Sequence, residues 1–156
     1  MNQIHDRIPH QDTHPFEKYT DWIRRHLPQP PARKLHVKVE NSINSFKPSR
    51  KWEYERQYQD ELYDWLKRDF PDTVEYEVTT GASRPDLVIN DIAIEIKGPT
   101  GNAELNTLTT KFLKYSNHYP HFIIVLFDCS FSEGHFNEIY KGIKQFVPHV
   151  KIIRIG

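Results

Sequence analysis

The stretch that decides the fold runs from residue 84 to residue 98 and reads RPDLVINDIAIEIKG. Two aliphatic, β-branched runs flank the pair Asn90-Asp91, and Asn and Asp tolerate the positive φ that hairpin turns require. A turn at this pair sets Asp86 directly opposite Glu95 on the neighbouring strand. The sequence therefore predicts a tight antiparallel β-hairpin in which two acidic residues face each other.

Side chains alternate between the two faces of a strand, so the predicted hairpin has one apolar face and one charged face. The charged face carries Asp86, Glu95 and Lys97, with the Cβ atoms of the two acids roughly 5 Å apart. Like charges directly opposite each other destabilise a sheet, and a divalent cation between them removes the conflict. Carboxylate oxygens suit Mg²⁺, with Mn²⁺ as a substitute, so we expect a metal site on this face.

Pro85-Asp86, followed after the hairpin by Glu95-Ile96-Lys97, resembles the motif of the PD-(D/E)XK nuclease superfamily, which has the restriction-endonuclease-like fold. The resemblance implies that Asp86 and Glu95 bind Mg²⁺ and that Ile96 lends its backbone carbonyl. It also implies that Lys97 orients the attacking water or helps to deprotonate it. While no metal is bound, the nearby acids should raise the pKa of Lys97 more than burial lowers it.

A helix before the hairpin supplies a candidate third acid. Residues 49–70 contain no Pro or Gly and predict one amphipathic helix with Ser49 as its N-cap. Glu55 lies at the centre of the apolar stripe of this helix, which is formed by Trp52, Tyr58, Leu62 and Leu66. A carboxylate that faces a core must be paired or bound to metal, so Glu55 is expected at the site, where it would support the Mg²⁺ directly or through water. The alternative is that Glu55 lies near the helix start, where unpaired backbone N–H groups favour an acid.

Three further residues are candidates for contact with the substrate. Lys111 lies at the margin of the apolar stripe of a predicted helix over 102–118, where members of the superfamily often carry Gln or Lys. The alternative is a lysine stem that lies along apolar surface with its charge in water. Thr100 could meet a phosphate at the start of that helix, although the connecting loop needs turn residues there in any case. Arg84, directly before the motif, is the third candidate.

Composition narrows the class of protein. The 156 residues fit one domain with its own core, and the formal net charge of zero lacks the basic excess that indicates tight non-specific nucleic-acid binding. The single Cys129 excludes an internal disulfide and a cysteine zinc site. The longest continuous apolar run, 122–127, is too short to cross a bilayer, so we expect a cytoplasmic protein with no membrane association.

Residues 1–48 are expected to form an N-terminal arm. Its start is polar and predicted to be disordered over 1–12, and a short amphipathic helix follows over 15–27. The alternation of Leu35, Val37 and Val39 indicates a short strand, and 41–49 indicates a turn-rich linker. The arm either packs on the core or is exchanged with a partner subunit.

Residues 49–156 are expected to form the nuclease domain. After its first helix the predicted elements are strands over 73–79, 86–90 and 92–97, a helix over 102–118, a strand over 122–127, a helix over 132–146 and a strand over 150–155. This alternation predicts a three-layer α/β domain with a central mixed β-sheet flanked by helices. The same order is the αβββαβ core that the resemblance implies.

The leading hypothesis is a metal-dependent endonuclease that hydrolyses phosphodiester bonds in DNA. A homodimer is favoured because cutting two strands needs two sites, while RNA or single-stranded substrates stay open. The alternative is a nucleic-acid-binding or assembly module that has the nuclease fold but no catalytic role. A third interpretation is a plain α/β domain in which Glu95 and Lys97 form a surface ion pair of little energetic value.

Overall fold

A computed structural model describes residues 34–156, which form one compact unit. The disordered start and the helix over 15–27 that the sequence predicts for the arm lie outside the described residues. None of the helices in the described part of the chain combines the length and the apolar character that a membrane crossing requires.

The centre of this unit is a mixed sheet of five strands in the order β1-β2-β3-β4-β5. The strands are β1 (Val74–Tyr76), β2 (Leu87–Ile89), β3 (Ile92–Lys97), β4 (His121–Phe127) and β5 (Val150–Ile155). Strand β2 is antiparallel to both of its neighbours, β1 and β3, whereas β3, β4 and β5 run parallel. The predicted hairpin register is confirmed, because Leu87 pairs with Ile94 and Ile89 with Ile92. Asn90 adopts the expected positive φ, 53°.

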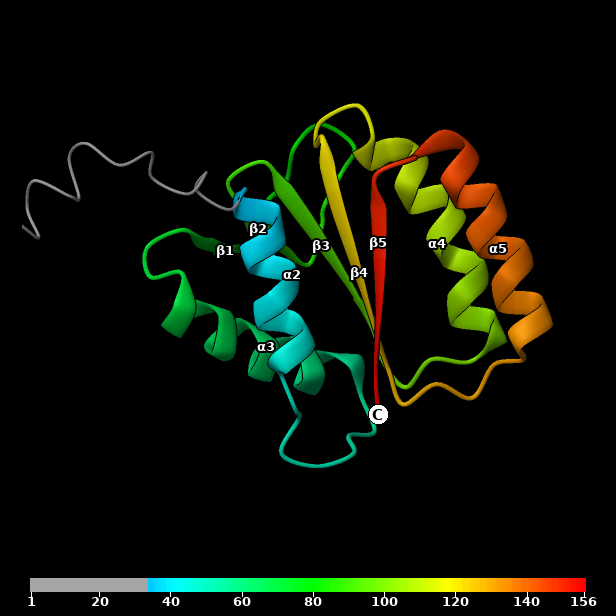
Figure 1. The fold of residues 1–156 in the computed structure, drawn as a ribbon, viewed down its shortest axis with the longest axis horizontal. Coiled ribbons are helices and arrows are strands. Elements are labelled where there is room, and N and C mark those ends of the chain that lie inside the picture. The colour runs from blue at the N-terminus through cyan, green and yellow to red at the C-terminus, as the bar shows by residue number, and fades with distance from the viewer. Residues whose placement is uncertain (1–33) are drawn as a thin grey trace, which may run out of the picture. The chain divides into compact units, whose positions relative to one another are not determined.

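Helices cover both faces of the sheet, as Figure 1 shows, so the α/β architecture with three layers is present. One face carries α2 (Leu35–Ser45) and α3 (Glu55–Asp69), and the other carries α4 (Asn102–Tyr115) and α5 (Glu133–Phe146). Each face has its own apolar core because strand side chains alternate between the faces.

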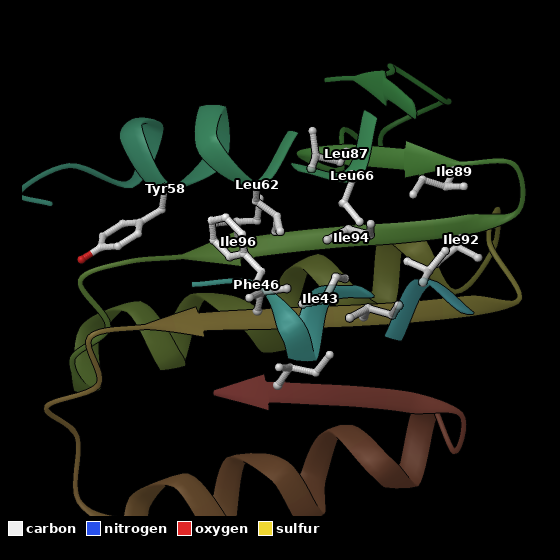
Figure 2. Close-up of a cluster of buried hydrophobic side chains, with 14 of the residues drawn as sticks. Ile43, Phe46, Tyr58, Leu62, Leu66, Leu87, Ile89, Ile92, Ile94 and Ile96 are labelled. Carbon is white, nitrogen blue, oxygen red and sulfur yellow. The ribbon is translucent and has the colours of Figure 1, made fainter. Parts of the chain in front are cut away.

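The core under α3 shows how the hairpin is held. Figure 2 shows Leu62 and Leu66 of α3 above Ile94 and Ile96 of β3, with Ile43 and Phe46 closing the cluster. These apolar side chains are buried, and the burial of each stabilises the fold by about 1.5–3 kcal/mol relative to an exposed position. Because the apolar residues of β3 point to this face, Glu95 and Lys97 point to the opposite one.

The strand predicted through Leu35, Val37 and Val39 is wrong, and the linker predicted over 41–49 is wrong for 41–45, whereas 46–49 are neither helix nor strand. The segment Leu35–Ser45 is helix α2, which packs on the sheet. The alternation in the sequence is short, whereas the buried side chains Val39, Ile43 and Phe46 follow the three- and four-residue spacing of a helix face. Of the two alternatives for the arm, residues 34–48 therefore pack on the core.

The helix predicted from Ser49 begins six residues later, at Glu55. Side chains of α3 satisfy the backbone of the preceding segment: the N–H of Ser49 donates to Glu61 Oε2 at 3.0 Å, and the N–H of Trp52 donates to the Tyr58 hydroxyl at 2.9 Å. The chain from 49 to 54 therefore folds back along α3 instead of extending it. Two smaller differences concern element ends. Strand β1 is shorter than the strand predicted over 73–79, and α4 ends at Tyr115, before the end of the helix predicted over 102–118.

Candidate active site

The candidate site lies where the two strands of the hairpin separate. The β2–β3 ladder ends at Leu87 and Ile94, whereas the β3–β4 ladder continues to Lys97. The end of β3 therefore has a strand neighbour on one side only. On its open side the N–H of Ile96 donates to Asp86 Oδ2 at 2.7 Å, so a carboxylate replaces the missing strand.

The geometry of β3 also fixes the direction of the Ile96 carbonyl. The N–H and C=O of one strand residue point toward the same neighbour. Since the N–H of Ile96 reaches Asp86, the carbonyl of Ile96 points to the same open side. A carboxylate and a backbone carbonyl, both hard oxygen donors, are thus directed to one edge of β3.

Glu95 is almost completely buried, with 1% of its surface exposed, and it is surrounded by donors. Its Oε1 pairs with the ammonium groups of Lys97, at 3.0 Å, and of Lys111. Its Oε2 lies 3.0 Å from the Tyr115 hydroxyl, whose single proton the carbonyl of Arg84 can also accept. This pairing explains how the charge of Glu95 is tolerated in the protein interior.

Lys97 connects Glu95 to Glu55. Its Nζ lies 3.1 Å from both carboxylate oxygens of Glu55, which is the first residue of α3 and remains partly exposed. Burial alone would lower the pKa of Lys97, but the charges of Glu95, Glu55 and Asp86 outweigh it, so the pKa is raised. Lys97 is therefore a charged donor at neutral pH. The direction of its pKa shift is the one that the sequence predicts.

Asp86 is the acid of the site whose charge is least compensated. Burial, and then the charge of Glu95, raise the pKa of Asp86 to about 7, although the N–H of Ile96 and the charges of Lys97 and Lys111 oppose the shift. The buried Gln59 donates to the carbonyl of Asp86 in a long contact of 3.5 Å. Asp86 therefore exchanges its proton near neutrality, and a cation would favour its ionised form.

The candidate substrate contacts have different surroundings. Lys111 reaches the site, where it pairs with Glu95. Thr100 is fully buried, and its Oγ1 lies 2.9 Å from the carbonyl of Lys97 and 3.0 Å from that of Phe127, either of which can accept its single proton. This is the turn role weighed against phosphate contact. Arg84 is exposed and pairs with Glu77 at 2.7 Å. A phosphate contact by Thr100 would require its hydrogen bond to break, whereas the exposed Arg84 guanidinium has further N–H groups beside the one on Glu77.

Sequence reasoning missed two residues of the site, Tyr115 and Gln59. The sequence pattern places Tyr115 on the apolar stripe of its helix, yet this residue follows Lys111 by four positions and so lies on the same face. Gln59 likewise follows Glu55 by four residues. In both cases the sequence contains one signal of a site residue: a polar side chain lies one helical turn after a residue that is already a candidate.

The donors of the site fit a magnesium-like ion chemically. Within residues 34–156, no set of three or more His, Cys, Asp or Glu side chains is arranged to hold a metal. Glu55 and Glu95 both contact the Lys97 ammonium. Mg²⁺ is commonly held by only one or two carboxylates, with water and substrate oxygens completing its shell. Asp86, Glu95 and the Ile96 carbonyl are oxygen donors of this kind, and Lys97, Lys111 and Tyr115 occupy the two oxygens of Glu95 in this structure.

Comparisons with known proteins found no family model, no curated protein and no solved structure that matches this chain.

Proposed function

We propose that this chain is a metal-dependent endonuclease that hydrolyses phosphodiester bonds in DNA, with a PD-(D/E)XK site and a restriction-endonuclease-like fold. The observation that carries the proposal is the placement of two buried acids, Asp86 and Glu95, beside a charged Lys97 at the open edge of β3. The order from α3 through β1, β2, β3 and α4 to β4 is the αβββαβ order that this fold requires.

In this proposal Asp86, Glu95 and the Ile96 carbonyl hold Mg²⁺ or Mn²⁺, and Glu55 supports the site through Lys97 or a water. A bound ion supplies a Lewis acid for the phosphate and a water of lowered pKa. Asp86 must release its proton before it can act as a ligand. The pKa values of these residues therefore contribute directly to the pH dependence of the reaction.

Lys97 has the role of a charged donor. Its raised pKa keeps it protonated, so it holds the attacking water by donating a hydrogen bond and does not accept the proton of that water. Lys111, which is partly exposed, can move from Glu95 to a substrate phosphate without exposing a buried charge of its own. Tyr115 keeps Glu95 oriented throughout, because its hydroxyl contacts the other carboxylate oxygen.

We further propose a homodimer in the cytoplasm, since hydrolysis of both strands of a duplex needs two sites. Sedimentation of the full-length protein at several concentrations tests the dimer. A mass of one chain at all concentrations would contradict it and would leave the chemistry of the single site unaffected.

The test of the activity uses supercoiled, linear, single-stranded and four-way-junction DNA, each with Mg²⁺, Mn²⁺ or EDTA. We expect cutting of at least one substrate with either metal, no cutting in EDTA, and loss of cutting in Asp86→Ala and Lys97→Ala. An exposed substitution on α5, Lys141→Ala, serves as the control and should cut normally. DNA that stays intact under all conditions would overturn the proposal.

One observation favours a second candidate, a nucleic-acid-binding or assembly module without catalysis. Lys97, Lys111 and Tyr115 together satisfy both oxygens of Glu95, so this part of the site is balanced by the chain's own groups. DNA that is bound but never cut, with affinity independent of metal, would support this candidate over the nuclease.

A further inference from the structure

The segment from Lys47 to Tyr54, which we call the basic loop, leads directly into Glu55. It carries three cations, Lys47, Arg50 and Lys51, against the single carboxylate of Glu53. The chain as a whole has no net charge, so this loop is a local positive segment next to a residue of the candidate site. It is exposed except for Trp52 and Pro48, which are partly buried.

The basic loop has a defined shape because three contacts hold it. Ser49 donates to Glu61 through both its N–H and its hydroxyl. The N–H of Trp52 donates to the Tyr58 hydroxyl, and the Lys51 ammonium pairs with Asp128 at 2.7 Å. Two of these contacts come from α3, which begins with Glu55, and the third comes from Asp128, the residue after β4, so the loop is fixed to one of the elements that carry the candidate site.

Two cations of the basic loop are available to a ligand. Within residues 34–156, Lys47 and Arg50 make no ion pair, whereas Lys51 and Arg154 each pair with a carboxylate. The Arg50 guanidinium lies over the Trp52 ring, 3.9 Å from its centre, and the residue is exposed. A guanidinium matches the geometry of a phosphate oxygen pair.

Arg50 and Lys51 separate two cavities. One has a volume of 540 Å³ and an apolar floor that includes Phe46, Tyr58 and Ile155. The other measures 210 Å³ and is bordered by Trp52, Tyr54 and Gln57. Phe46 and Tyr58 are buried, whereas Tyr54 is exposed and borders the smaller cavity together with Arg50 and Lys51. Proteins bind single strands with such a combination, phosphates lying on the cations and bases stacking on an exposed ring.

Tyr54 directly precedes Glu55, a residue of the candidate site, in the sequence. It is 67% exposed, and its N–H donates to Gln57 Oε1 at 3.3 Å, which helps to fix the start of α3. The next residue is Glu55, whose carboxylate contacts Lys97. A base stacked on Tyr54 would therefore belong to a nucleotide close to the reacting phosphate.

We infer that the basic loop binds unpaired DNA beside the phosphate that is cut, with Lys47 and Arg50 on the phosphates and Tyr54 stacked on a base. This inference rests on the proposed function and narrows its substrate to DNA that contains a single-stranded segment. The bases of an intact duplex are stacked on one another and present no face to Tyr54. Two available cations also supply too little charge for tight duplex binding by counterion release alone.

The test measures binding separately from cutting. Fluorescence anisotropy with a labelled single strand and with the corresponding duplex, in EDTA and in the Asp86→Asn background, reports affinity while the DNA stays intact. We expect the single strand to bind at least tenfold more tightly than the duplex. Tyr54→Ala should weaken single-strand binding by roughly tenfold or more.

The chain offers a matched control for each substitution. Phe146, at the end of α5, is 64% exposed and lies on the helix layer opposite α3, so Phe146→Ala should leave binding unchanged. The double variant Lys47→Ala/Arg50→Ala should lower the slope of log affinity against log salt by about 0.7 for each phosphate that the protein no longer neutralises. Lys144→Ala, on α5, should keep the slope of the unaltered protein.

The possible outcomes distinguish this inference from the proposed function. Equal affinity for duplex and single strand, no DNA binding, or binding unaffected by Tyr54→Ala and Lys47→Ala/Arg50→Ala would overturn the inference, even if the protein cuts DNA. Binding that depends on the loop supports the inference. If such binding is found without metal-dependent cutting of any substrate, only the proposed catalytic function fails.

Discussion

The N–H of Ile96 donates to Asp86 Oδ2 at the point where β2 ends and β3 continues. This contact brings a carboxylate to the strand that carries Glu95 and Lys97, at an edge with no strand neighbour. An unpaired edge N–H is ordinarily satisfied by water or by another strand. Here it orients an acid whose raised pKa reflects its burial and its proximity to Glu95.

Asp86→Asn should stabilise the protein at alkaline pH. A carboxyl with a raised folded-state pKa contributes stability below its unfolded value, near 4, and this contribution is lost as the pH rises through about 7. The Asn side chain keeps an acceptor for the N–H of Ile96 but carries no charge. We expect the free energy of unfolding of the variant to exceed that of the wild type by on the order of 1–3 kcal/mol at pH 8 and by little at pH 4. Urea unfolding at the two pH values measures the difference. An equal effect at both pH values would show that the Asp86 charge does not destabilise the fold.

The cleavage rate should fall as the pH drops through about 7 at low metal concentration, because a protonated Asp86 cannot act as a ligand. Since metal and proton compete for the same carboxylate, more Mg²⁺ should move this acid limb to lower pH. Single-turnover rates over a range of pH at two Mg²⁺ concentrations measure the shift. If the pH of the acid limb does not change with the Mg²⁺ concentration, the group that titrates is not Asp86.

Lys97→Met should destabilise the fold and abolish cleavage. It leaves Glu95 with Lys111 and Tyr115 as partners, and removal of one member of a buried pair costs on the order of 3 kcal/mol. The matched variant Lys111→Met removes a more exposed partner of the same carboxylate and should cost less. Denaturant melts of both variants make the comparison.

A compensating substitution separates stability from chemistry. Lys97→Met/Glu95→Gln also removes the buried charge that has lost its Lys97 partner, so part of the lost stability should return while cleavage stays absent. Recovery of cleavage in this double variant would remove both residues from the proposed mechanism.

Gly98→Ala should destabilise the protein, because an added Cβ would lie 2.8 Å from Phe127 Cβ and 2.8 Å from Tyr58 Cδ2. Such overpacking costs about 1–3 kcal/mol. Gly142→Ala is the control: it lies inside α5, with no atom within 4 Å of the added Cβ, and should stabilise by about 0.5–1 kcal/mol. Thermal melts that moved in the same direction for both variants would contradict this account of the packing.

The sequence predicted the hairpin well because its pattern is local. The turn at Asn90 and the alternation of Ile94, Glu95 and Ile96 determine both the register and the faces, with no reference to the rest of the chain. Glu55 does contact Lys97, but it is the first residue of α3 and partly exposed, which is the alternative of an acid near the helix start and not the centre of an apolar stripe.

Errors arose where distant contacts decide the structure. Helix α2 is selected by packing of Val39 and Ile43 on the sheet, and the alternating letters of its first turn conceal that spacing. The start of α3 depends on Glu61 and Tyr58, which accept hydrogen bonds from residues up to twelve positions earlier. The partners of Glu95 likewise come from α4, and no local pattern shows that Tyr115 turns its hydroxyl toward the site.

The central claim is that Asp86 and Glu95 hold a divalent cation, and calorimetric titration with Mn²⁺ tests it most directly. We expect saturable heat for the unaltered protein and loss of that heat in both Asp86→Asn and Glu95→Gln, with Lys141→Ala unchanged. Identical titrations for all four proteins would contradict the claim and with it the proposed nuclease site.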